Sequence, residues 1–391
     1  MIPILYVQST SEIGGSDVTL LRTIEALDHT RIEPHVALPH DGPLVEAFRK
    51  TGCRVHLLPA MRKLTSRRGM SYLGRYAAGY VPGALAVAGL IRREGIALVH
   101  TNSIHNLYGF LAARWTRRPH VWHVREIVVR PRAIQWLEVK LVRRFSTRFI
   151  VVSDAVGDMF RAPGGRAPRH MVKLYDGVDL DAFHPRQRTD NRIRRELGVG
   201  ERAPLLGIVT RLDPWKGVGA FLEAASLIRR GVPQARFLIC GGEIEGHEGL
   251  EASLRRQARS LGLDGAVLFS GWRYSPRDIP EVYGALDVSV QCPARPEPYG
   301  LANVEAMASG VPGIAAAAGG PLELCVQGET TLLVPPRNPR ATAEAAVTLL
   351  RDPARRLAMG AAGRRRAERL FDRRLCVRAL EDLYATVVGR P

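Results

Sequence analysis

Short apolar runs alternate with longer stretches of helical periodicity along the whole chain, and this alternation restricts the fold more than any other feature. Such alternation is typical of βαβ units, in which helices connect parallel strands. The pattern fills the first half, stops at a charged segment after Asp181 and starts again at Leu205. We therefore predict an α/β protein with two doubly wound sheets. The expected strands are 4–8, 35–38, 54–57, 98–100, 121–124, 149–152 and 172–174, then 205–210, 236–240, 267–269, 288–290, 313–315 and 332–334.

The length of the chain supports two domains. A chain of 391 residues is too long for one ordinary domain. We predict domains at 1–183 and 184–370, because Asp181–Pro185 and the charged stretch after it separate the two repeats of the pattern. The remainder, 371–391, is predicted as a C-terminal helix with one apolar face. Doubly wound sheets bind ligands beyond the carboxyl ends of their strands, so we expect the site in a cleft that both domains face.

Cysteine usage and apolar segments indicate the compartment. Five cysteines are scattered without a Cys-x-x-Cys pair, which argues against a disulfide framework or a zinc site and favours a reducing cytoplasm. The start of the chain, Met1–Val7, has no basic leader and is predicted as a strand. The nearest candidate for a membrane span, Tyr76–Ile91, is too short and is broken by glycine and proline. We expect a cytoplasmic protein, soluble or peripheral on the membrane.

The formal net charge of +18 is concentrated in the first half, in basic clusters over 62–93 and 114–148. A basic surface beside an apolar helix favours attachment to an anionic membrane surface. No nucleic-acid-binding motif is present in either cluster, so nucleic acid is not an expected partner. An arginine-rich composition with solvated faces is the alternative, and the sequence leaves it open.

One segment, Pro296–Pro312, carries the most chemical information. Pro298 and Gly300 mark a sharp turn, and a helix is predicted to begin at Leu301 and end near Ser309. The N-terminus of a helix offers unpaired N–H groups and a positive dipole end, which suit a phosphate. Glu297 before the turn and Glu305 inside the helix place a carboxylate on each side of that position.

This segment resembles the E-x7-E signature of glycosyltransferase family 4, whose members are retaining glycosyltransferases with the GT-B fold. The resemblance implies two Rossmann-like domains facing across a cleft, an N-terminal acceptor domain and a C-terminal donor domain, with the last helix crossing back to the first domain. It implies transfer of a hexosyl group from a nucleotide-sugar donor to a saccharide or lipid-linked acceptor. Polysaccharide or glycolipid biosynthesis for the cell envelope is the expected context.

The family also implies roles for the two acids and for two cations. Arg211 and Lys216, in the segment Thr210–Gly217, resemble the pair that holds the donor diphosphate. Fixed cations stabilise the negative charge that develops on the leaving phosphate, so we expect neither a metal nor a cofactor. Glu305 and the Gly300–Leu301 helix start are expected to bind the donor ribose and diphosphate, and Glu297 the hydroxyls of the donor sugar.

The remaining candidate residues follow from weaker resemblances. Glycines are needed where backbone comes close to a ligand. His123 ends a predicted strand of the acceptor domain, where the family often places a histidine near the transferred sugar. Asp176 stands where the family carries Asn. The donor-binding set is completed by Gly14, Gly15, Gly319, Gly320 and Arg273.

Two other classes of protein fit the same sequence. A nonhydrolysing nucleotide-sugar epimerase shares the architecture, but would convert the donor without an acceptor. A noncatalytic basic binding protein would keep its binding when Glu297 or Lys216 is replaced. The spacing Gly14-Gly15-Ser16-Asp17 is not the Gly-x-Gly-x-x-Gly of dinucleotide-binding proteins, which argues against a dehydrogenase.

Overall fold

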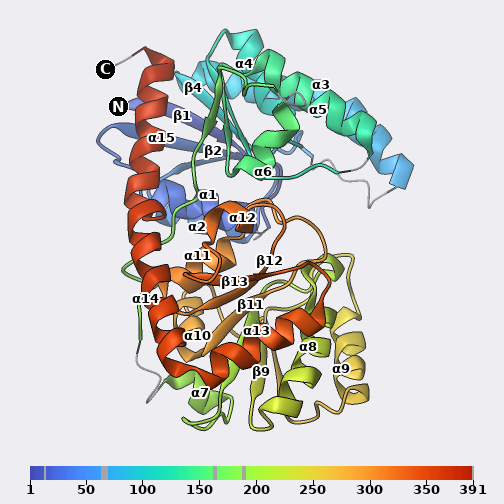
Figure 1. Ribbon diagram of the computed structural model, residues 1–391. Helices are drawn as coiled ribbons and strands as arrows, with labels where there is room; N and C mark the ends of the chain where they lie inside the picture. The colour runs from blue at the N-terminus through green and yellow to red at the C-terminus, as the bar shows by residue number, and fades with distance from the viewer. Residues whose placement is uncertain (13–14, 63–68, 130, 162–164, 187–190, 390–391) are drawn as a thin grey trace. The chain divides into compact units, whose positions relative to one another are not determined.

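Two compact units make up the chain in the computed structural model (Figure 1), which describes residues 1–12, 15–62, 69–129, 131–161, 165–186 and 191–389. The first unit contains 1–177 and 373–391, and the second contains 178–372. The chain thus passes between the units at Gly177–Val178 and at Asp372–Arg373.

The first unit is built on a seven-stranded parallel sheet with the order β3-β2-β1-β4-β5-β6-β7. The order reverses between β1 and β4, so this is the topological switch point at which such sheets bind ligands. The strands are β1 Ile2–Val7, β2 Ile32–Leu38, β3 Arg54–Leu57, β4 Leu98–Asn102, β5 His120–Val124, β6 Arg148–Val151 and β7 Met171–Lys173. The helices are α1 Gly15–Glu25, α2 Pro43–Lys50, α3 Gly69–Arg93, α4 Tyr108–Thr116, α5 Arg132–Phe145, α6 Asp154–Gly157, the 3-10 helix η2 Asp158–Phe160 and α15 Arg373–Val388.

Apolar layers cover both faces of this sheet. On one face, α1, α2 and α15 bury residues such as Leu20, Phe48 and Leu380 against the strands. On the other face, α3 and α4 bury residues such as Val87 and Ala112. Sheets of parallel strands are covered on both faces, and this explains why their strands read as nearly continuous apolar runs.

The second unit is built on a six-stranded parallel sheet with the order β10-β9-β8-β11-β12-β13. One large core cluster joins these strands to α8, α9 and α13. The strands are β8 Leu205–Val209, β9 Arg236–Cys240, β10 Val267–Gly271, β11 Val288–Gln291, β12 Gly313–Ala316 and β13 Thr331–Val334. The helices are α7 Arg192–Glu196, η3 Pro214–Lys216, α8 Val218–Gly231, α9 Leu250–Ser260, α10 Ile279–Ala285, α11 Leu301–Ala308, α12 Pro321–Leu324, α13 Pro339–Arg351 and α14 Pro353–Leu370.

The predicted fold class is confirmed, and every strand expected from the sequence is present. The largest difference is at β2, which begins at Ile32 rather than at His35. The first unit ends at Gly177, before the predicted boundary at residue 183. Beyond that boundary, Asp179 Oδ1 accepts the N–H groups of Asp181 and Ala182 in a turn that belongs to the second unit.

The C-terminal helix α15 belongs to the first unit. It buries Val377, Leu380 and Tyr384 in the same core cluster as Leu20 and Ile24 of α1. The helix is also held by polar contacts, since the buried Glu381 accepts the N–H of Asp28 at 2.6 Å.

The apolar stretch Tyr76–Ile91 forms most of α3. Val87, Leu90 and Ile91 are completely buried in the core, while Val81 and Leu85 are exposed. One face of the stretch therefore packs in the core, while the other carries exposed apolar side chains. No helix in the part of the chain that the structure describes is long and apolar enough to cross a membrane.

Candidate active site

Lys216 and Glu297 form the centre of the candidate site in the second unit. Lys216 ends the short η3 helix, which Asp213 caps by accepting the N–H of Trp215. Its Nζ lies 2.8 and 3.1 Å from the two carboxylate oxygens of Glu297, and both side chains are less than a fifth exposed (18% and 17%). Ion pairs shielded from solvent in this way are screened less than surface pairs, so each charge holds the other in place.

Gly217 fixes the position of the lysine. Its φ of +79° lies in the left-handed region, and a Cβ at this residue would lie 1.8 Å from the carbonyl oxygen of Cys292. Only glycine fits both conditions. The turn between η3 and α8 is consequently packed directly against the segment that follows β11.

The Gly319–Gly320 turn packs against the segment that carries Glu297. The backbones of Glu297 and Gly319 form an isolated parallel β-bridge, and the N–H of Gly320 donates to the carbonyl of Glu297 at 2.7 Å. A Cβ at Gly319 would lie 2.2 Å from that same carbonyl oxygen, and one at Gly320 would lie 2.2 Å from the carbonyl of Tyr299. The two glycines therefore determine where the Glu297 backbone lies.

Helix α11 begins directly after this segment. Its N-cap residue is Gly300, which has a φ of +103° and no side chain to cap the first turn. Exposed first-turn N–H groups at such a position suit an anion. Within the helix, Glu305 is buried, and the Tyr283 hydroxyl lies 3.3 Å from its Oε2.

The structure brings several of the predicted residues together. Lys216, Glu297, Gly300, Gly319 and Gly320 lie in one contiguous group. Arg211 is 39% exposed, with its Nη2 at 3.6 Å from Asp213 Oδ2, on the same turn as Lys216. Arg273 pairs with Glu196 at 3.1 Å and is half exposed.

A second group of polar residues lies in the first unit, around His123. His123 ends β5 and is 5% exposed. Burial and the neighbouring Arg125 guanidinium lower the pKa of His123 well below its ordinary value, so the ring is neutral near pH 7. Of the two predicted glycines near this sheet, Gly15 begins α1, and Gly14 lies outside the described residues.

Arg125 was not predicted, and it connects this group. Its guanidinium donates to Asp176 through Nη1, to Asn102 Oδ1 at 2.8 Å through Nε, and to His123 Nδ1 at 3.3 Å through Nη2. Asn102 in turn donates to Gln8 at the end of β1. Gln8 follows β1 and Asn102 is the last residue of β4, the two strands at the topological switch point, and polar residues at those strand ends are the signal that could have identified them.

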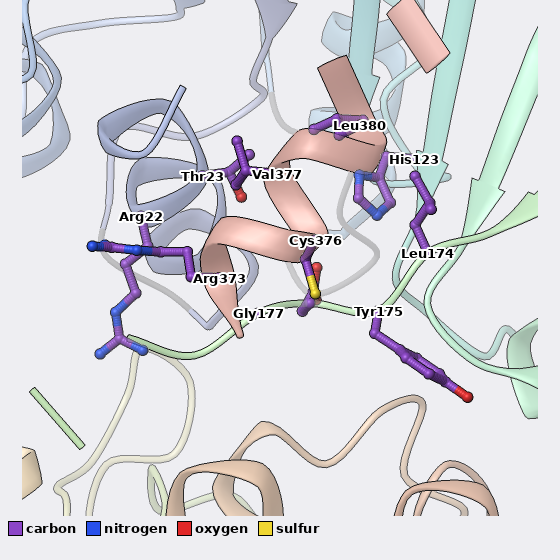
Figure 2. Close-up of a pocket in the computed structure, with 11 residues that line it drawn as sticks. Arg22, Thr23, His123, Leu174, Tyr175, Gly177, Arg373, Cys376, Val377 and Leu380 are labelled. Carbon is purple, nitrogen blue, oxygen red and sulfur yellow. The ribbon is translucent and has the colours of Figure 1, made fainter. Parts of the chain in front are cut away.

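His123 and Asp176 also line a pocket of the first unit (Figure 2). The walls come from α1, from the chain after β7 and from the first turns of α15. The lining residues are Arg22, Thr23, His123, Leu174, Tyr175, Asp176, Gly177, Arg373, Cys376, Val377 and Leu380.

Two parallel doubly wound units of this kind, with a lysine–glutamate pair at the carboxyl ends of the second sheet, define a GT-B protein. The model of the family "Glycosyl transferases group 1" matches residues 189–366, and that of the "Glycosyl transferase 4-like domain" matches residues 14–174. The chain belongs to glycosyltransferase family 4, as its E-x7-E segment predicted. These matches do not favour an epimerase or a noncatalytic binder.

Similar proteins agree with this family. The D-inositol 3-phosphate glycosyltransferase of Corynebacterium kroppenstedtii is 34% identical over 62% of this chain and 54% of that protein. The match thus spans about half the length of that relative. The enzyme of the same name from Corynebacterium urealyticum is 27% identical over 98% of this chain and 93% of its own. Among solved structures, Anabaena HepE in complex with UDP and glucose has a TM-score of 0.84 and 25% identity, covering 99% of this chain and 100% of HepE.

Proposed function

We propose that this protein is a retaining glycosyltransferase that moves a hexosyl group from a nucleotide-sugar to an acceptor hydroxyl. The observation that carries the proposal is the Lys216–Glu297 pair, held within 3.1 Å beside the Gly300 start of α11. A cation and a helix N-terminus together suit the diphosphate of a nucleotide-sugar. A carboxylate at the same place suits the hydroxyls of the sugar attached to it.

Each residue of the group then has a chemical role. Arg211, Lys216 and the first N–H groups of α11 stabilise the charge on the departing diphosphate, which makes a metal or cofactor unnecessary. Glu297 orients the donor sugar, while Glu305 binds the ribose. A phosphate oxygen of the donor accepts the proton of the acceptor hydroxyl on the same face, so retention needs no protein base. Gly319 and Gly320 bring backbone close to the donor.

The similar proteins suggest the substrates. HepE was solved with UDP and glucose, and the Corynebacterium relatives take their name from an inositol phosphate. We accordingly propose a UDP-sugar as donor and a hydroxyl of a phosphorylated polyol or lipid-linked saccharide as acceptor. Cell-envelope polysaccharide or glycolipid synthesis on the cytoplasmic side is the proposed context.

Donor binding is the direct test of the proposed function. At about 100 times its dissociation constant, a UDP-sugar is expected to add roughly 2.7 kcal/mol to the free energy of unfolding. Thermal unfolding with UDP-, GDP- and ADP-sugars measures this shift, and mass spectrometry with an acceptor measures transfer. Release of an epimerised donor in the absence of any acceptor would identify an epimerase instead.

Helix α5 supports attachment to an anionic membrane surface. Trp136 and Leu137 are 62% and 48% exposed, and the exposed Lys140 Nζ lies 4.7 Å from the Trp136 ring centroid. The one acidic residue of α5, Glu138, is buried and pairs with His105 at 2.7 Å, so it does not offset the basic outer face. Exposed aromatic and basic residues on one helix face are typical of interfacial helices.

Charge reversal on α5 tests this attachment. Each Lys or Arg near an anionic surface contributes about 1 kcal/mol, so replacing Arg143 and Arg144 with Glu is expected to weaken binding by at least tenfold. Co-sedimentation with phosphatidylglycerol vesicles measures the bound fraction. The same two substitutions at Arg229 and Arg230, which lie in the last turn of α8 in the second unit, are the control. Equal sedimentation of both variants would contradict the membrane proposal.

A further inference from the structure

Arg125 determines which nitrogen of His123 carries the proton. Its Nη2 lies 3.3 Å from His123 Nδ1. A guanidinium has only donors, so Nδ1 must accept. In a neutral imidazole the single proton then resides on Nε2. The ring consequently has a fixed tautomer, with an N–H donor on the side away from Arg125.

That donor has no hydrogen-bond partner in the part of the chain that the structure describes. His123 Nε2 is buried and makes no hydrogen bond among the described residues, and the same holds for His100 Nε2. The two rings lie 5.4 Å apart at 68°, an edge contact rather than a hydrogen bond. A buried unsatisfied donor costs free energy unless a ligand or water completes it. His123 is one of the residues that line the pocket of Figure 2.

Arg125 itself is held from two sides. It is 8% exposed, Asp176 accepts from its Nη1, and Asn102 Oδ1 accepts from its Nε at 2.8 Å. These two contacts fix the plane of the guanidinium and aim Nη2 at the histidine. The substitution of Asp for the Asn of the family at position 176 thus supplies a counter-charge to a buried arginine.

We propose that Arg125 is a positioning residue that holds His123 as a neutral Nε2–H donor, and that His123 donates to a substrate oxygen during glycosyl transfer rather than accepting a proton. This inference rests on the proposed function for its substrate, although the tautomer itself does not. His123 cannot serve as a base in this state, because its only unprotonated nitrogen faces a cation. The charged and titratable groups around the ring are His100, Arg125, Asp176, Arg22, Arg373, Cys376 and Tyr384.

Nitrogen-15 spectra of histidine-labelled protein test the tautomer directly. The His123 signals, assigned by comparison with His123→Gln, are expected to show an unprotonated Nδ1 and a protonated Nε2 throughout the range of about pH 5.5–8.5, in which an ordinary histidine titrates. A proton on Nδ1, or a titration within that range, would overturn the proposal. Because the spectra need no substrate, they decide the tautomer even if no donor sugar is turned over.

The pH dependence of turnover tests the role of Arg125. The double variant Arg125→Met/Asp176→Asn removes both charges of the buried pair, so neither is left unpaired. In this variant no cation requires His123 Nδ1 to accept a hydrogen bond. The pKa of His123 should rise when the cation is removed. We expect kcat about tenfold below wild type at pH 8, the cost of one hydrogen bond, and recovery as the pH falls, because the imidazolium again carries a proton on Nε2. The wild-type profile should be flat over this range.

Two comparisons separate positioning from general damage. Arg194→Lys alters another buried arginine, 2% exposed and paired with Asp287, and should change the melting temperature but not the pH profile. His123→Gln, which keeps an N–H donor, should retain more activity than His123→Phe. A loss in the double variant that is equal at every pH would show a purely structural role and refute the proposal.

Discussion

Replacing Lys216 with Met is expected to lower kcat by roughly 10²–10³, the usual effect of removing one group that stabilises charge in the transition state. The lysine is 18% exposed and bound by both oxygens of Glu297, so its ammonium is already positioned before the donor arrives. Water cannot replace a fixed cation of this kind without reorganising. Steady-state kinetics with a UDP-sugar, measured well below the melting temperature, give the ratio of kcat values.

The matched control for this substitution is Lys173→Met. Lys173 Nζ lies 2.7 Å from Asp154 Oδ2, a lysine–carboxylate pair of similar geometry but with side chains 35% and 45% exposed. Exposed pairs contribute about 0–1 kcal/mol to stability, and this one belongs to the first unit, whereas the Lys216 group belongs to the second. Its loss should leave turnover within about twofold of wild type, a change near the resolution of such a measurement. If Lys216→Met also turns over within that range, Lys216 has no part in the chemistry.

Local sequence patterns predicted the sheets well. Runs such as Leu205–Val209 and Arg236–Cys240 are apolar on both faces of the strand, and helices cover both faces, so the burial that forms each strand is visible in a short window. The start of α11 at Leu301 was also predictable from a short window. Gly300 can adopt the left-handed backbone conformation that precedes the first helical residue.

The site itself was only partly predictable, because its contacts join distant segments. Arg125 meets Asp176 across 51 residues, and Lys216 meets Glu297 across 81. The family motif indicated Lys216 and Glu297 individually, but no local pattern reveals that they form a pair. Arg125 belonged to a basic cluster that composition alone assigned to the surface, whereas the structure buries it.

Apolar composition alone did not show which side chains of the first unit are buried and which are exposed. The longest apolar stretch, in α3, indicated a helix beside a membrane surface, yet Val87, Leu90 and Ile91 of this stretch pack in the core. Exposed apolar side chains also lie on α5, whose sequence is more polar and whose buried side is formed by Glu138 and Val142. Composition counts apolar residues, but it does not say which of them the sheet covers.

Replacing Gly319 with Ala is expected to destabilise the second unit by about 2–4 kcal/mol and to abolish most turnover. Its φ of +78° costs an alanine about 1–2 kcal/mol. The new Cβ would also lie 2.2 Å from the carbonyl oxygen of Glu297, which is backbone and cannot rotate away. The Glu297 segment must therefore shift, and Glu297 with it. Displacement of a catalytic group by about 1 Å costs on the order of 10² in rate.

Gly328→Ala separates the two causes, because Gly328 has a nearly identical φ of +76° and no atom within 4 Å of the added Cβ. It should lose only the conformational part, about 1–2 kcal/mol, and keep its turnover. Chemical denaturation measures both free energies of unfolding, and kinetics on the folded fraction measure both rates. A Gly319→Ala protein that matches Gly328→Ala in stability and rate would mean that Gly319 does not position Glu297. A rate loss confined to Gly319→Ala would instead show that turnover depends on the position of the Glu297 carboxylate. That position exists only because Gly319 has no side chain where it packs against the Glu297 backbone.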